Sequence, residues 1–278
     1  MIRRPPRSTQ SRSSAASDVY KRQEIVSSAD LLQHLFVWSA EDRQAHLRAV
    51  AAVIRAKDVG FQLIAQRRQA GEPITELETQ ARLSEVLREA GLRPAHPPIV
   101  AFGGHASDAH YAPSPQTDRR LEPGMCVLLD IWGGEPGRPV SDITWMGFAG
   151  PPTEEYRRVW EAVRGARDLA LSLLTAGAVS EGWQVDRAAR DFLAARGYGA
   201  AFRHRLGHNL GRDYPHGPCV NLDDLETHDT RKLLPGLAVT VEPGVYLGHI
   251  GVRSEVNVLL TEGGAIVTTP QQEEPYQV

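Results

Sequence analysis

The chain has 278 residues, a formal net charge of −3 and 41% hydrophobic residues, enough apolar material for one large domain or two smaller ones. Because no apolar run approaches the roughly 18 residues that a membrane span needs, a membrane-spanning protein is excluded. Two cysteines, Cys126 and Cys219, are too few for a disulfide framework and lack the spacing of a zinc or redox motif, so a reducing cytoplasm is the expected location.

Residues 1–23 differ from the rest of the chain in charge and composition. They carry six basic side chains and one acidic one, whereas residues 24–278 carry 25 basic and 33 acidic side chains. The segment has too few apolar residues to fold, so we expect a disordered arm. It is similar to translated adapter sequence, more than to a transit peptide or a nucleic-acid-binding arm. The acidic charge of the remaining chain argues against nucleic acid as a partner.

Capping signals and helical periodicity predict two helices in the first half. The first begins after the N-cap Ser39 and keeps apolar residues at helical spacing as far as Ile64. The second begins at a capping box formed by Thr75 and Glu78 and ends at Gly91. A turn-rich stretch follows and leads into a predicted strand.

The second half repeats this order. After the break at Pro151-Pro152, apolar spacing predicts helices over residues 159–173 and 180–196. A histidine-rich loop comes next, and strands are predicted over residues 238–241 and 255–260.

A faint internal repeat places carboxylates at matching positions in the two halves. Asp130 and Glu242 each follow a Pro-Gly turn and a short hydrophobic strand at the same spacing. Asp142 and Glu255 come 12 and 13 residues later, where the return strand of a hairpin would lie beside the first carboxylate. The sequence therefore predicts a duplicated α+β unit in which four carboxylates converge between the halves.

Four carboxylates in one place repel each other and stay protonated unless cations neutralise them. A metal centre removes this repulsion, and oxygen-rich ligation suits manganese, with iron, cobalt or zinc as alternatives. The stretch 204–211 contains histidines that can supply a nitrogen ligand. Taken singly, Asp142 and Glu242 are equally compatible with simple turns, but the repeat and the histidine cluster together favour a metal centre.

Five motifs, in this order, resemble those of the pita-bread metallopeptidases, the relatives of methionine aminopeptidase, aminopeptidase P, prolidase and creatinase. They are Leu129-Asp130-Ile131, Ser141-Asp142-Ile143-Thr144, Gly207-His208-Asn209-Leu210-Gly211, Val241-Glu242-Pro243-Gly244-Val245-Tyr246 and Arg253-Ser254-Glu255. The resemblance covers about residues 40–270. It implies an α+β pita-bread fold with two pseudo-symmetric halves around a dinuclear metal site, and a homodimer.

The resemblance also implies a division of the chain and a set of metal ligands. Residues 41–278 would form the catalytic domain, and residues 24–40 a linker or the remnant of a lost N-terminal domain. Asp130 would be a ligand of one divalent ion, and His208 with Glu242 would hold the other. Asp142 and Glu255 would be the bridging carboxylates.

Four further side chains resemble the outer residues of the aminopeptidase P and prolidase branch. These substrate-side residues are His110, His204, His216 and Arg253. Glu242 would accept a proton from the attacking water and return it to the leaving amine. His216 or His110 would donate a hydrogen bond to the developing oxyanion. His105 and His249 are expected to be exposed residues without a role.

The chain departs from the family pattern at two places within the motifs. Trp145 replaces the arginine that usually follows Asp-Ile-Thr, and His216 lies eight residues after His208 where seven is usual, so residues 212–215 must loop out. The family's extra N-terminal domain is also not recognised. The replacement at Trp145 leaves the metal ligands untouched, whereas the shifted His216 and the N-terminal domain bear on substrate preference.

The predicted function is a metal-dependent exopeptidase acting on small peptides, at N-terminal Xaa-Pro bonds or on Xaa-Pro dipeptides. The alternatives on the same fold are a creatinase-like C–N hydrolase, a dimethylsulfoniopropionate lyase and a catalytically inactive binding module. The complete ligand set argues against a metal-free or inactive version.

Overall fold

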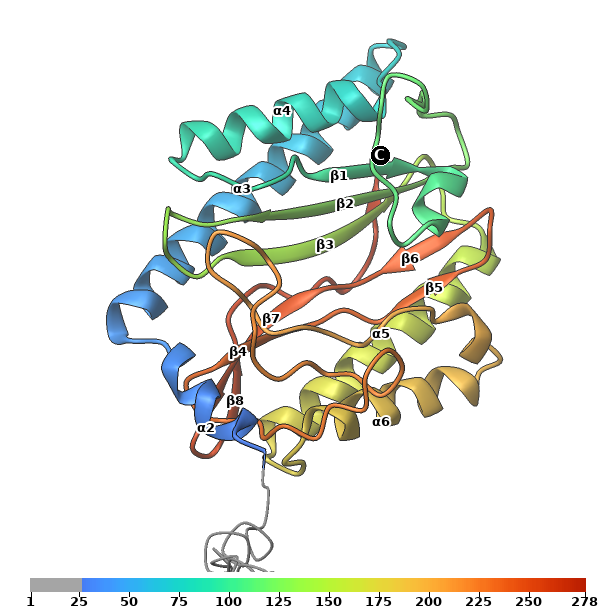
Figure 1. Ribbon diagram of the computed structural model, residues 1–278. Helices are drawn as coiled ribbons and strands as arrows, with labels where there is room; N and C mark the ends of the chain where they lie inside the picture. Colours follow the sequence, from blue (N-terminus) through green and yellow to red (C-terminus); the bar gives the residue numbers. More distant parts are fainter. Residues whose placement is uncertain (1–26) are drawn as a thin grey trace, which may run out of the picture.

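The computed structural model describes residues 27–278, so the arm expected over residues 1–23 lies outside the described residues. Strands occupy the middle of the molecule and a pair of helices lies on each side of them (Figure 1). One pair consists of α3 (Ala40–Gln69) and α4 (Glu76–Glu89), and the other of α5 (Glu154–Thr175) and α6 (Gly182–Ala194). The two predicted helix pairs are confirmed.

Local capping explains where these helices begin. The Ser39 hydroxyl accepts a hydrogen bond from the backbone N–H of Asp42, whose carboxylate accepts one from the Ser39 N–H. Thr75 and Glu78 form the same reciprocal pair at the start of α4. Each pair satisfies two backbone donors that the first helical turn leaves free.

The first sheet has the strand order β1 (Ile99–Phe102), β2 (Cys126–Gly133), β3 (Ser141–Phe148) and β9 (Tyr276–Gln277). The strands β1, β2 and β3 are antiparallel, and β9 joins the outer edge of β3 in parallel. Next to β9, the side-chain amide of Gln272 bonds both the backbone N–H and the carbonyl of Met146. The predicted first hairpin is therefore present as β2 and β3.

The second hairpin is longer and is interrupted. Its outer part pairs β4 (Ala238–Val241) with β7 (Val256–Thr261), and β8 (Gly264–Val267) adds to β7. Its inner part pairs β5 (Gly244–Tyr246) with β6 (Gly251–Arg253) in the same register. The break falls at Glu242-Pro243, where proline has no N–H to donate, and at Ser254-Glu255. Both predicted carboxylates therefore lie at one interruption of a single hairpin.

The described residues form three apolar clusters. One lies mainly among α5, α6 and the C-terminal strands, and another among α3, α4 and β1 to β3. The smallest joins residues of both halves and contains Trp38, Val140, Leu210, Ala238 and Leu259. The described residues also contain three short 3-10 helices, η1 (His34–Phe36), η2 (Gly103–Ser107) and η3 (Gly199–Ala201). None of the described helices is long and apolar enough to cross a membrane.

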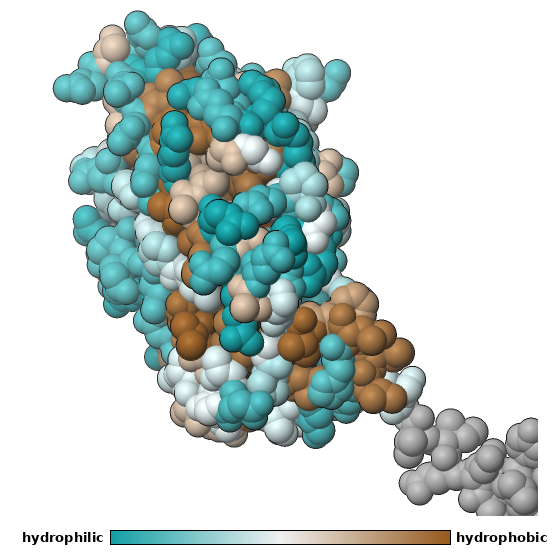
Figure 2. All heavy atoms as spheres, turned by 90° about the vertical axis from the view of Figure 1, so that its left-hand side faces the viewer, coloured by the Kyte–Doolittle hydropathy of each residue, from teal (hydrophilic) through white to brown (hydrophobic). Residues whose placement is uncertain are grey.

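The stretch before α3 is helical and attached to the second half. It contains α2 (Ala29–Gln33) and η1, and the Gln33 amide bonds the Lys232 carbonyl and the Val220 N–H. Figure 2 shows hydrophobic side chains gathered beside the grey atoms, and the exposed ones in α2 and η1 are Leu31, Leu32, Leu35 and Phe36. The expected linker over residues 24–40 is thus folded against the protein in its described part.

Candidate metal centre and active site

The first hairpin presents two of the predicted ligands on one face. Asp130 lies opposite Thr144, and Trp132 lies opposite Asp142. Because alternate residues of a strand share a face, Asp130 and Asp142 are diagonal neighbours on the same side of the hairpin. The predicted return of the second carboxylate beside the first is therefore what the register produces.

Trp145, which replaces the family's arginine, points to the other face of β3. Its ring lies under the Lys57 ammonium, 4.0 Å from the ring centroid, and next to Tyr276. Lys57 is buried and pairs with Asp58 at 2.6 Å. The substitution therefore affects packing between α3 and the first sheet, and leaves the ligand face unchanged.

The histidine-rich segment runs beside β4 like an added strand. The Glu242 N–H bonds the Leu206 carbonyl at 2.8 Å, and the Thr240 N–H bonds the His208 carbonyl at 2.9 Å. Gly207 makes this approach feasible, because a Cβ there would sit 2.1 Å from the Thr240 carbonyl oxygen. The pairing brings His208 next to Glu242.

A second contact joins the two hairpins. The Thr144 hydroxyl donates to Glu255 Oε2 at 2.8 Å, and the Glu255 N–H bonds the Thr144 carbonyl at 3.3 Å. Thr144 thereby holds a carboxylate of the second half against the first sheet. No role was predicted for Thr144, although it lies in the Asp-Ile-Thr motif.

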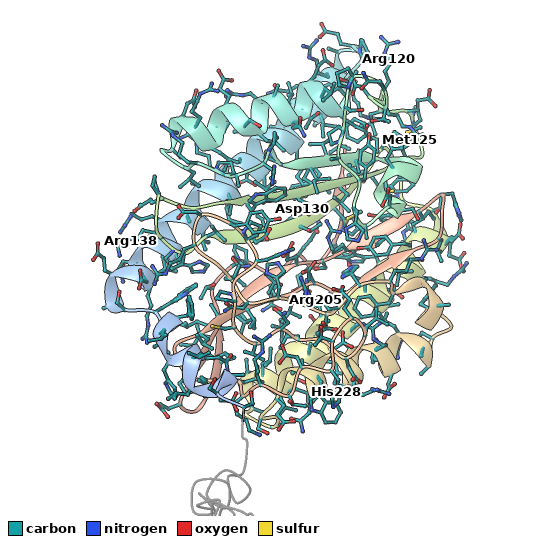
Figure 3. The ribbon with its side chains drawn as sticks, viewed as in Figure 1. Arg120, Met125, Asp130, Arg138, Arg205 and His228 are labelled. Atoms are coloured by element: carbon teal, nitrogen blue, oxygen red, sulfur yellow. The ribbon has the colours of Figure 1, made fainter. Side chains whose placement is uncertain are left out.

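All five predicted ligands line one cavity of about 510 Å³. Ligand atoms of Asp142, His208 and Glu255 lie within 4.8 Å of one another, and all three side chains are buried. His208 Nε2 is 3.6 Å from Asp142 Oδ2 and 3.6 Å from Glu242 Oε1. Asp130 comes from β2 in the first half (Figure 3).

The hydrogen bonding of this cluster is incomplete in a way that fits a cation. His208 Nδ1 lies 3.1 Å from the Asn209 carbonyl, which can only accept, so the proton is on Nδ1. The lone pair of Nε2 then faces carboxylate oxygens of Asp142 and Glu242, and acceptors do not stabilise each other. Asp142 Oδ1 is buried without a partner among the described residues. A metal ion would satisfy all of these atoms.

The electrostatics lead to the same conclusion. Burial raises the pKa of Asp130, Asp142 and Glu242 to about 7 each, and it raises the pKa of Glu255 well above its usual range. The Arg253 guanidinium opposes the rise, but one buried cation does not balance four carboxylates. At neutral pH the cluster therefore retains protons unless metal ions replace them.

Arg253 and His204 belong to one hydrogen-bond chain. Arg253 donates to Asp130 Oδ2 at 2.5 Å, to the Thr144 hydroxyl at 3.0 Å and to the Tyr246 oxygen at 3.2 Å. His204 donates from Nδ1 to the Arg205 carbonyl at 2.7 Å, so its Nε2 accepts from the Tyr246 hydroxyl at 2.7 Å. Burial lowers the pKa of His204 to about 3, which keeps the ring neutral.

This chain has a consequence for two predicted substrate-side residues. Both are buried and engaged with protein groups, so in this structure Arg253 orients the Asp130 carboxylate and His204 supports Tyr246. Tyr246, which the sequence analysis left without a role, links them. Its only sequence signal is its place in the motif that begins with Val241-Glu242.

The other two predicted substrate-side residues, His216 and His110, line the exposed part of the cavity. The His216 ring lies edge-on to the His208 ring, with 4.3 Å between centroids. The extra residue before it is absorbed at Asp213, which has a left-handed φ of 62° and accepts a hydrogen bond from the Gly137 N–H at 2.6 Å. The predicted loop over residues 212–215 is present, and His216 still reaches the cluster.

The expectation that His105 is exposed and idle is wrong, whereas His249 is exposed as expected. The His105 side chain is 21% exposed and its Nδ1 bonds the buried carboxylate of Glu76 at 2.9 Å. It also stacks on Tyr111, the neighbour of His110, with 4.4 Å between ring centroids. The contact could not be predicted from the sequence because the partner, Glu76, lies on a different element, in the first turn of α4.

Comparisons with known proteins agree with this geometry. The model of metallopeptidase family M24 matches residues 42–262. An Xaa-Pro dipeptidase from Pyrococcus furiosus is 32% identical over 201 residues, which are 72% of this chain and 55% of that protein. An uncharacterized peptidase from Staphylococcus epidermidis is 33% identical over 172 residues, 62% of this chain and 46% of that protein. The chain thus spans about half the length of the curated relatives it matches.

Solved structures are similar over most of the chain. An X-Pro aminopeptidase from Thermotoga maritima superposes with a TM-score of 0.78 at 27% identity, covering 94% of this chain and 70% of that one. A prolidase from Pyrococcus furiosus superposes with a TM-score of 0.75 at 27% identity, covering 88% of this chain and 68% of that one.

Proposed function

Because the chain belongs to metallopeptidase family M24, we propose that it is an exopeptidase that hydrolyses Xaa-Pro bonds, at the N-terminus of short peptides or in Xaa-Pro dipeptides. The pita-bread fold expected from the motifs is confirmed by the family match and the solved relatives. The family implies divalent metal ions. The observation that carries the proposal is the ligand set, in which the His208 Nε2 lone pair faces carboxylate oxygens and Asp142 Oδ1 has no hydrogen-bond partner among residues 27–278.

Two divalent ions would be held by Asp130, Asp142, His208, Glu242 and Glu255. When bound, such ions polarise a carbonyl oxygen and make water more acidic. Manganese is the proposed metal, because four of the five donors are carboxylates.

Glu242 is the proposed proton carrier. It lines the cavity beside the other ligands, where its carboxylate can accept a proton from water and release it to the leaving nitrogen. His216 and His110, on the exposed side of the cavity, would donate hydrogen bonds to the substrate carbonyl as negative charge develops.

The preference for proline rests on the chemistry of its bond and on the cavity wall. An Xaa-Pro bond has no N–H, so a site that accepts it must hold the proline ring by apolar contact. Pro97, Ile99 and Trp132 supply apolar surface in the cavity. The Xaa-Pro relatives support the same substrate class.

The test is a substrate panel with metal-free protein and protein given manganese, cobalt or zinc. Xaa-Pro dipeptides, Xaa-Pro-Xaa tripeptides and matched alanine peptides separate a dipeptidase, an aminopeptidase and a peptidase indifferent to proline. We expect activity only with added metal and only on the proline substrates. Faster cleavage of the alanine peptides would refute the proline assignment, and full activity without metal would refute the metal dependence.

The cytoplasmic location and the homodimer stay predictions. The homodimer is tested by light scattering on the purified chain, and a monomer at micromolar concentration would contradict it.

A further inference from the structure

The edge of β3 that faces away from β2 is bonded by the side-chain amides of Asn257 and Gln272. Asn257, on β7, accepts from the Asp142 N–H at Oδ1 with a length of 3.0 Å, and its Nδ2 donates to the Asp142 carbonyl. Gln272 makes the same pair of bonds to the backbone of Met146, at 2.8 and 2.7 Å. Each amide thus gives one residue of β3 the donor and the acceptor that a neighbouring strand would supply.

Between these two amides, Thr144 is bonded to Glu255. The Glu255 N–H donates to the Thr144 carbonyl at 3.3 Å, and the Thr144 hydroxyl donates to Glu255 Oε2 at 2.8 Å. Residues 142 and 144 of β3 therefore meet residues 257 and 255 in antiparallel order, where the two halves of the molecule adjoin (Figure 1). The Asn257 side chain and the Glu255 backbone together fix the register between β3 and the start of β7.

Asn257 is itself held in one orientation. It is fully buried, and its Oδ1 also accepts from the Ser141 hydroxyl at 2.9 Å. Its backbone N–H donates to Thr269 Oγ1 at 2.9 Å, and its carbonyl accepts from the Thr268 N–H at 2.8 Å. Turning the amide by 180° would set its NH₂ group against the Asp142 N–H and its oxygen against the Asp142 carbonyl. The contact is therefore a rigid one.

The two amides hold residues of different kinds. Met146 is a buried apolar residue, whereas Asp142 is one of the clustered carboxylates and has an oxygen without a hydrogen-bond partner among residues 27–278. Asn257 reaches Asp142 across 115 residues of sequence and lies two residues after Glu255, a carboxylate of the other half. It thereby joins the two carboxylates that are expected to bridge the ions.

Building on the proposed metal-dependent peptidase, we propose that Asn257 is a positioning residue that sets the place of Asp142 relative to Glu255 and so determines the affinity and geometry of the metal centre. Its bonds go to the backbone of Asp142, so it acts through this ligand and not on the substrate. Removing a group that orients a metal ligand typically weakens metal binding by about 10- to 100-fold.

The experiment uses the contact at Met146 as its internal control. Asn257→Ala removes the amide from the ligand, and Gln272→Ala removes the same pair of bonds from the same strand at a residue that is not a ligand. Ser141→Ala is a milder variant that removes only the hydroxyl bonded to the Asn257 amide. The metal-free full chain is titrated with manganese by calorimetry. The visible absorption of the cobalt-loaded protein reports ligand geometry, and urea unfolding of the metal-free protein reports stability.

We expect Asn257→Ala to bind manganese about 10- to 100-fold more weakly than wild type and to change the cobalt spectrum. Ser141→Ala should show a smaller change in the same direction. Gln272→Ala should lose a comparable amount of unfolding free energy, because it gives up equivalent buried hydrogen bonds, but should keep the wild-type manganese affinity and cobalt spectrum. A purely structural role of Asn257 does not produce this separation between stability and metal binding.

Wild-type manganese affinity and an unchanged cobalt spectrum in Asn257→Ala would overturn the proposal and leave the peptidase function standing. An equal loss of affinity in Gln272→Ala would also overturn it, because general loosening of β3 would then be the cause. If Asn257→Ala does not fold, Ser141→Ala decides, and wild-type binding in that variant overturns the proposal. Metal binding without cleavage of any peptide would refute the peptidase function and leave this test intact, whereas a wild type that binds neither manganese nor cobalt would refute both.

Discussion

Among the buried carboxylates of residues 27–278, Glu76 and the ligand cluster differ in how completely they are hydrogen-bonded. Glu76, fully buried in the first turn of α4, accepts from the Phe102 N–H at 2.7 Å, His105 Nδ1 at 2.9 Å, the Tyr111 hydroxyl at 2.5 Å and the Arg119 N–H at 3.2 Å. In the ligand cluster Asp142, His208 and Glu255 are also buried, yet Asp142 Oδ1 has no hydrogen-bond partner in the described chain.

The difference separates a structural carboxylate from a functional one. A buried polar group that is fully satisfied rigidifies its surroundings, whereas one left unsatisfied costs stability until a ligand completes it. Glu76 fastens the loop that carries Tyr111 and His110 to α4. The ligand cluster, by contrast, has atoms that a bound cation would satisfy. Burial alone does not distinguish the two.

A Glu→Gln substitution should reduce turnover in the ligand cluster and reduce stability at Glu76. Glu242→Gln removes the proposed base and a ligand, so kcat on Ala-Pro should fall by about 10²–10⁴-fold or more. Without metal, the free energy of unfolding of Glu242→Gln should not be lower than that of wild type, because a carboxylate with a raised pKa is replaced by a neutral group. Steady-state kinetics and urea unfolding measure the two effects. Near-normal turnover with both metals bound would show that Glu242 is not the base.

Metal binding should stabilise the folded protein through the ligand cluster and not through Glu76. At free manganese of about 100 to 1,000 times its dissociation constant, the free energy of unfolding should rise by about 3–4 kcal/mol. The increment should be the same in Glu76→Gln and much smaller in Glu242→Gln. Urea titrations with and without chelator measure it. An unfolding free energy of wild type that does not change with manganese would contradict the proposed metal centre.

Acid should reveal a third buried group that is satisfied only when neutral. His46 donates from Nδ1 to the Val140 carbonyl and accepts at Nε2 from the Thr268 hydroxyl, each at 2.8 Å, and burial lowers its pKa from 6.5 to about 4. Between pH 6.5 and about pH 4 His46 therefore binds a proton in the unfolded chain and stays neutral in the folded chain. Stability due to His46 falls as pH drops from 6.5 towards 4, by on the order of 3 kcal/mol.

The difference between wild type and His46→Gln isolates this effect from the carboxylates, which titrate in the same range. Wild type should be more stable at pH 7.5, and its advantage should shrink as the pH is lowered. A constant difference across the range would show that His46 is not held neutral.

The smallest effect is expected at the satisfied centre. Glu76→Gln replaces an acceptor by an NH₂ group that faces donors, so the free energy of unfolding should fall by about 1–3 kcal/mol. Metal content should stay unchanged, and kcat should change much less than in Glu242→Gln. Urea unfolding and metal analysis test this. Loss of bound metal would mean that Glu76 supports the ligand cluster directly.

What could be predicted from sequence is what depends on neighbours along the chain. The capping pairs at Ser39 and Thr75 and the two hairpins are set by short spacings, and the structure contains them. The convergence of the ligands followed from the repeat. The family motifs supplied the remaining correspondence between residues and site.

The contacts that could not be predicted join distant parts of the chain. The bond from Thr144 to Glu255 spans 111 residues, and the approach of Gly207 to β4 depends on packing between a loop and a strand. His105 is an example of a wrong inference, because a glycine-rich surrounding says nothing about a carboxylate on another helix. Spacing shows which face a side chain occupies, and tertiary packing decides what it meets there.

The parallel strand β9 has a consequence for biosynthesis. The outer edge of β3 belongs to the first half of the molecule, but its last two residues, Gly147 and Phe148, pair with a segment that follows the whole second half. An uncovered strand edge is prone to pairing with other chains. A nascent chain therefore exposes this edge until the second half has been translated. The first half needs the second half to protect this edge from pairing with other chains.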